Sequence, residues 1–100
     1  MDKKGKATEE QIQEWKRKYG TVYEVAVEDS MCYLHSPDRA TMKAVAAVGI
    51  SDPIRSNEVL LENCWLGGDE SIKTNDPLFM GVSQVLADIL QIKEAYLKKL

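Results

Sequence analysis

The sequence has few of the features that mark several common classes of protein. Its 13 lysine and arginine residues face 16 acidic ones, so the net charge of -3 gives no electrostatic reason to expect binding to DNA or RNA. No apolar run approaches the ~20 residues needed to cross a bilayer. The opening MDKKGKATEEQ also lacks the apolar core of a secretory signal. We therefore expect a cytoplasmic protein with neither a nucleic-acid nor a membrane partner.

Reactive side chains are also scarce. Cys32 and Cys64 are the only cysteines and lack the close spacing of metal ligands, so we expect reduced, buried thiols, with a disulfide or a reactive thiol as the alternative. His35 is the only histidine, and no cluster of ligands or catalytic partners surrounds it in the sequence. No nucleophile elbow, phosphate-binding loop, zinc-protease or dinucleotide-binding motif occurs. The sequence thus predicts a protein that is not an enzyme and uses no cofactor or metal.

The stretch ENCWLGGDESIKTNDP, residues 62–77, contains the best candidates for a site. Four side chains there carry oxygen atoms suited to calcium, namely Asp69, Glu70, Asn75 and Asp76. Their spacing does not match a calcium-binding loop, and Asp76 is placed to cap a helix that begins at Pro77. Gly67 and Gly68 follow a predicted helix end, which favours a C-cap over a phosphate site. We interpret the stretch as the junction between two helices.

The first part of the chain predicts a tail, a helix and a β-hairpin. Residues 1–7 are rich in lysine and are expected to form a disordered tail, followed by a single domain over residues 8–100. A capping pattern predicts a helix over residues 8–19. Alternating apolar residues in 21–28 and the short run 31–35 predict two paired strands. Because two strands alone are marginal in water, the hairpin must be covered by helices or extended by another chain.

Three prolines, each preceded by Ser or Asp, mark the starts of three more helices. These are expected over residues 37–48, 53–66 and 77–99. The fold class is therefore α+β, with an N-terminal helix, one β-hairpin and three helices that include a long C-terminal one. At 1.5 Å per residue the last helix would be roughly 34 Å long, more than so small a domain readily covers. Its second half, QIKEAYLKKL, is expected to project or to lie against another subunit.

In this order the elements from Tyr23 to Leu100 resemble the small tail assembly chaperones of long-tailed bacteriophages and prophages. The resemblance rests on the hairpin that leads into HSPDR, on the block LLENCWLGGDESI, on the Asp-Pro helix start and on the ending KEAYLKKL. The helix over residues 8–19 lies outside it. Such chaperones are often made in a short form and a longer frameshifted form, and this chain resembles the short one.

The resemblance implies a non-enzymatic assembly factor that works in the cytoplasm of the host bacterium. Its partner would be the hydrophobic tape-measure protein, kept soluble until subunits of the tail-tube protein, a second candidate partner, polymerise around it. A homo-oligomer is expected. The alternative is a structural or virion-associated protein of the same phage or prophage tail module.

Helical periodicity, and not the resemblance, suggests where a partner would bind. The second half of the chain carries apolar side chains on helical faces that a domain of this size is not expected to cover completely. The predicted partner-binding residues are Trp65, Leu66, Phe79, Leu86, Ile89, Leu90, Tyr96 and Leu97.

Overall fold

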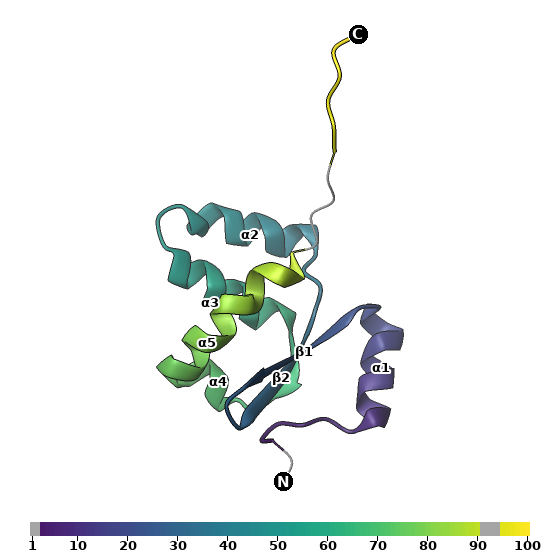
Figure 1. Cartoon of the computed structure of the whole chain (residues 1–100), viewed down its shortest axis with the longest axis vertical. Coiled ribbons are helices and arrows are strands. Elements are labelled where there is room, and N and C mark those ends of the chain that lie inside the picture. The colour runs from purple at the N-terminus through teal and green to yellow at the C-terminus, as the bar shows by residue number, and fades with distance from the viewer. Residues whose placement is uncertain (1–2, 91–94) are drawn as a thin grey trace.

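A computed structural model describes residues 3–90 and 95–100, and its elements form an α+β fold in which a sheet lies between helices (Figure 1). In chain order the elements are α1 (Glu9–Tyr19), β1 (Val22–Val27), β2 (Ser30–His35), α2 (Arg39–Gly49), α3 (Pro53–Cys64), β3 (Trp65–Gly68), α4 (Ser71–Thr74), α5 (Asp76–Leu86) and the 3₁₀ turn η1 (Ala87–Ile89). Helix α1 lies on one side of the sheet, and α3 and α5 lie on the other. Helix α2 packs on α3.

The predicted N-terminal helix and β-hairpin are confirmed. Strands β1 and β2 pair antiparallel from Val22 opposite His35 to Val27 opposite Ser30, with a two-residue turn between them. Successive side chains of a strand point to opposite faces of a sheet. Accordingly, Cys32 and Leu34 enter the core under α3 and α5, whereas Tyr33 faces α1.

The sheet contains a third strand that the sequence analysis did not predict. The helix expected over 53–66 ends at Cys64, and β3 pairs antiparallel with β2, with Gly68 opposite Cys32. Gly67 and Gly68 are therefore strand residues and not the C-cap we expected. A Cβ on Gly68 would lie 2.5 Å from the Cα of Cys32, so glycine is what allows the two strands to approach so closely.

Two helices begin one or two residues from where the sequence placed them. The cap of α2 is Asp38, whose carboxylate accepts from the Thr41 amide at 2.7 Å, and α2 begins at Arg39 and not at Pro37. The cap of α5 is Asn75 and not Asp76. Two short polar side chains lie near each of these helix starts, and either can accept from the first-turn amides. The sequence therefore does not decide which of the two is the N-cap.

The prediction of a long helix over 77–99 is wrong in its second half. Helix α5 and η1 together end at Ile89, and residues 95–100 have no helical structure. Residues 91–94 lie outside the described part of the chain. Leu97 and Leu100 are fully exposed, so neither packs against the core formed by the described residues. A short helix without such packing is marginal in water.

The N-terminal residues lie beside the hairpin. We expected residues 1–7 to form a disordered tail, and the structure describes residues 3–7 of this segment. The Lys4 amide donates to the Asp29 carbonyl at 2.7 Å, and the Lys4 carbonyl accepts from the Met31 amide at 2.8 Å. The Ala7 amide donates to the Tyr33 hydroxyl at 3.2 Å. These bonds attach residues 4–7 to the turn between β1 and β2, to the start of β2 and to the Tyr33 side chain.

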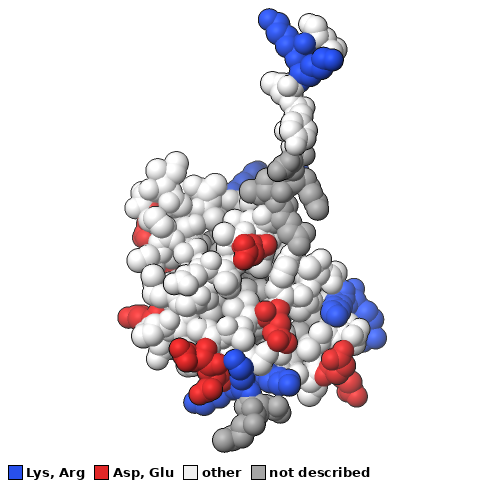
Figure 2. All heavy atoms as spheres, in the orientation of Figure 1, with Lys and Arg blue, Asp and Glu red and all other residues white. Residues whose placement is uncertain are grey.

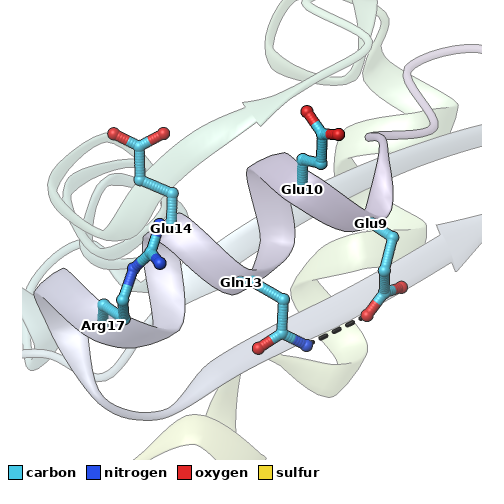
Figure 3. A pocket seen from close by; sticks show the side chains of 5 residues that line it. All are labelled: Glu9, Glu10, Gln13, Glu14 and Arg17. Atoms are coloured by element: carbon cyan, nitrogen blue, oxygen red, sulfur yellow. Dashed lines mark hydrogen bonds between the residues drawn. The ribbon is translucent and has the colours of Figure 1, made fainter.

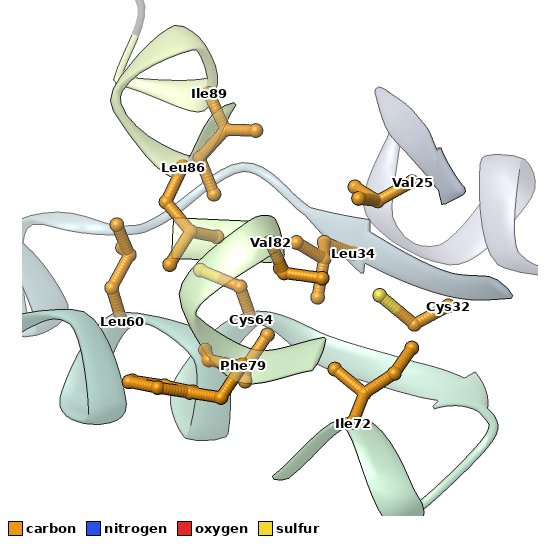
Figure 4. Packing of buried hydrophobic residues seen from close by; sticks show 11 residues of the cluster. Val25, Cys32, Leu34, Leu60, Cys64, Ile72, Phe79, Val82, Leu86 and Ile89 are labelled. Carbon is orange, nitrogen blue, oxygen red and sulfur yellow. The ribbon is translucent and has the colours of Figure 1, made fainter. Parts of the chain in front are cut away.

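One apolar cluster fills the space between the sheet and helices α3 and α5 (Figure 4). The side chains of Leu34, Cys64 and Val82 meet near its centre and are fully buried. Cys32 and Cys64 are free thiols with no exposed surface, which confirms the expectation that both are buried. Burial raises the pKa of Cys32 to about 12 and that of Cys64 to about 11, because a thiolate loses its hydration there. Both thiols are therefore un-ionised and poorly nucleophilic at neutral pH.

Candidate partner-binding surfaces

The structure separates the eight predicted partner-binding residues into three environments. Phe79, Leu86 and Ile89 belong to the core, with exposed fractions of 8%, 1% and 3%. Trp65, Leu66 and Leu90 are half-buried, and Tyr96 and Leu97 are almost completely exposed. The eight residues thus form no single surface, because the apolar stripe of α5 is used to build the core.

Trp65 has a neighbour on each side. Its ring packs against the core cluster, and the Lys73 ammonium lies 4.3 Å from the ring centroid. That ammonium also pairs with the Glu70 carboxylate at 3.0 Å. A cation over an indole face is a favourable contact, so Lys73 covers the ring where the core does not.

The opposite side of the sheet holds α1 through aromatic contacts. The Trp15 ring lies 5.4 Å from the Tyr33 ring and would contact a Cβ added to Gly67 at 3.2 Å. Tyr19 stacks on His35 with the ring centroids 4.7 Å apart and the planes at 3°. The Nδ1 atom of His35 also forms a 2.8 Å hydrogen bond with the Ser36 carbonyl oxygen. His35 therefore has a structural role in joining α1 to the end of β2.

A shallow hollow of about 420 Å³ runs along the outer surface of α1 (Figure 3). It is lined by Glu9, Glu10, Gln13, Glu14 and Arg17. The Gln13 amide donates to the Glu9 carboxylate at 3.0 Å. All five side chains come from one helix that contains no buried residue, so the hollow is a space between solvated side chains.

Asp69, one of the four oxygen-bearing candidates in the 62–77 stretch, is engaged in local structure. The Asp69 carboxylate accepts from the Ser30 hydroxyl at 2.6 Å and from both the amide and the hydroxyl of Ser71. The hydrogen bond from Ser30 is the main reason why the pKa of Asp69 lies below its ordinary value, followed by those from Ser71. The described residues contain no group of three or more side chains arranged to hold a metal ion.

Of the large apolar side chains that are exposed, Tyr96 and Leu97 belong to the predicted set, whereas Tyr19, Ile50, Ile54, Met80, Val85 and Leu100 do not. Leu97 and Leu100 are fully exposed and Tyr96 is 90% exposed, in a segment that extends away from the folded unit (Figure 1). Ile50 and Met80 are exposed as well, at 98% and 50%. The exposure of Ile50 could have been predicted from the sequence, because Ile50 directly follows Gly49, which ends α2, and precedes the Ser-Asp pair at the start of α3. The exposure of Met80 could not have been predicted, since only the packing of α5 decides which of its apolar residues face outward.

No helix within the described residues is long and apolar enough to cross a membrane. The chain matches no known family model, and no curated protein or solved structure is significantly similar to it. A functional proposal therefore depends on the geometry described above together with the resemblance of the sequence blocks.

Proposed function

We propose that the protein is a non-enzymatic tail assembly chaperone of a long-tailed bacteriophage or prophage. Its client is the tape-measure protein, which it keeps soluble in the host cytoplasm while the tail tube is assembled. The blocks HSPDR and LLENCWLGGDESI support this proposal, since they give the sequence its resemblance to such chaperones. The first leads into α2, and the second spans the end of α3, the strand β3 and the start of α4.

The observation that carries the proposal is the exposed apolar end of the chain. Leu97 and Leu100 have exposed fractions of 101% and 107% and are separated by two lysines. Such a segment offers apolar contacts to a hydrophobic helix, while the lysines keep the free form hydrated. A holding chaperone needs this combination, because it must compete with aggregation of its client.

Co-expression with the tape-measure protein of the same genome tests the proposal. The full chain is expected to bring the tape-measure protein into the soluble fraction and to co-purify with it. A variant that lacks residues 95–100 is expected to lose most of this effect. The matched control is Ile50→Ser, which removes an equally exposed apolar side chain elsewhere. A tape-measure protein that stays insoluble with the full chain would contradict the proposal.

Mass spectrometry of purified particles separates the chaperone from a virion component. A chaperone leaves the tail once assembly is complete, so its peptides are expected to be absent from virions in which tail-tube peptides are abundant. A constant copy number per particle would instead identify a structural protein of the tail module.

A further inference from the structure

Residues 3–7 form a strap across one end of the sheet, and backbone atoms hold this N-terminal strap in place. Its Lys4 residue bonds through both its amide and its carbonyl, to the Asp29 carbonyl at 2.7 Å and to the Met31 amide at 2.8 Å. A third bond joins the strap to the Tyr33 hydroxyl. None of residues 3–7 is buried, so the strap can lift without uncovering an apolar side chain of its own.

The N-terminal strap lies close to the sheet only because residue 5 is glycine. The φ of Gly5 is 89°, in the left-handed region that other residues rarely adopt. A Cβ on Gly5 would lie 2.5 Å from the Met31 carbonyl oxygen and 2.7 Å from the Gly68 carbonyl carbon. It would also collide with the Asp69 amide nitrogen. A side chain at this position would therefore push the strap away from the sheet.

The strap is basic, and the surface that it crosses carries acidic residues. Three of its five residues are lysines. The Lys3 ammonium donates to the Glu28 carbonyl at 2.8 Å, in the turn that Glu28 and Asp29 form between β1 and β2. Basic and acidic side chains lie next to one another at the end of the molecule where the chain begins (Figure 2). Such charges add little stability each, but they favour a basic segment over an acidic one at this place.

We propose that the N-terminal strap is a releasable cover over a binding site for an extended, basic, glycine-containing segment of another protein. The site consists of the Asp29 carbonyl, the Met31 amide and the Tyr33 hydroxyl, which an extended backbone can bond when the strap lifts. The strap shows what the site accepts, namely a glycine where the backbones approach closely and lysines beside the acidic turn. Because the strap belongs to the same chain, it competes with a partner at a high effective concentration. The inference does not rest on the proposed client.

Amide hydrogen exchange of the full chain tests whether the strap lifts separately. Gly5→Val is expected to raise the exchange of the Met31 amide by about tenfold or more, while amides of α3 stay unchanged. Gly20→Val is the matched control, because Gly20 also has a positive φ but a Cβ there would meet no atom within 4 Å. It is expected to leave the exchange of Met31 within about twofold. A Met31 amide that stays protected in Gly5→Val, or equal acceleration throughout α3, would overturn the proposal.

A peptide added in trans tests the binding site itself. The probe is a synthetic peptide of residues 1–8, MDKKGKAT, titrated into isotope-labelled full chain and followed by NMR. In the Gly5→Val chain the peptide is expected to cause saturable shifts of the Met31 and Asp69 amide signals. The unaltered chain, whose own strap occupies the site, is expected to bind it at least about tenfold more weakly.

Two altered peptides test the chemistry of the segment that the site accepts. A peptide with the change Gly5→Val is expected to cause no saturable shift in the Gly5→Val chain, because its side chain meets the same collision. A peptide with all three lysines changed to glutamine is expected to bind about threefold more weakly, through loss of the paired charges. The absence of saturable shifts with the original peptide, equal binding to both chains, or equal binding of either altered peptide would each overturn the proposal.

Discussion

At the scale of single residues, Gly68 and Gly20 show what a sequence does not reveal about glycine. Both have positive φ values, 137° and 83°, which other residues adopt at a cost. A Cβ on Gly20 would meet no atom within 4 Å, whereas one on Gly68 would lie 2.5 Å from both the Cα of Cys32 and the carbonyl oxygen of Met31. In the sequence both glycines lie just after a predicted helix, over residues 8–19 and 53–66 respectively. Only the pairing of β3 with β2 distinguishes them.

Replacing each glycine with alanine separates backbone strain from collision. Gly20→Ala is expected to lower the free energy of unfolding by about 1 kcal/mol, through strain alone. Gly68→Ala adds a collision with the backbone of β2, so its expected cost is roughly 2–4 kcal/mol. Urea denaturation measures both values. If Gly20→Ala and Gly68→Ala lowered the free energy of unfolding equally, β3 would not approach β2 as closely as the structure shows.

At the scale of elements, local patterns predicted α1, β1, β2 and the approximate positions of α2, α3 and α5, whereas the short helix α4 was not predicted. The alternation in residues 21–28 and the proline positions were sufficient for β1 and for the approximate starts of α3 and α5. Strand β3 was missed because its four residues, Trp65–Gly68, have no period of their own and gain strand structure only by pairing with β2. The C-terminal helix was overextended because periodicity continues past Ile89 while the core does not.

The N-terminus of α5 provides a test at this scale. The Asn75 side chain accepts from the Leu78 amide at 3.2 Å, so Asn75→Ala is expected to cost about 1 kcal/mol of stability. Asp76 is already inside the helix and contributes mainly by its charge near the positive end of the dipole. Asp76→Ala is therefore expected to cost only roughly 0.3–0.5 kcal/mol. Thermal unfolding of the two variants compares them, and the reverse order would restore Asp76 as the cap.

At the scale of the whole molecule, the site was less predictable than the fold. The α+β class, the N-terminal helix and the hairpin followed from the sequence, whereas three of the eight predicted partner-binding residues lie in the core. Periodicity identifies an apolar face without saying what covers it. For Phe79, Leu86 and Ile89 the cover is the sheet and α3, and for Leu97 no described residue provides it.

The difference between residues that the core covers and residues that it does not also applies to α1. It predicts that α1 unfolds locally, separately from the core. Helix α1 has no buried residue and meets the sheet through Trp15 and Tyr19, on the face opposite the apolar cluster. Trp15→Ala is expected to raise amide hydrogen exchange in α1 by about tenfold or more, while amides of β2 and α3 change far less. Lys16→Ala, on the exposed side of α1, is the matched control and should leave the exchange of α1 almost unchanged. If Trp15→Ala instead accelerates exchange in β2 and α3 as much as in α1, the helix and the core form one cooperative unit, and the sheet depends on both of its faces for stability.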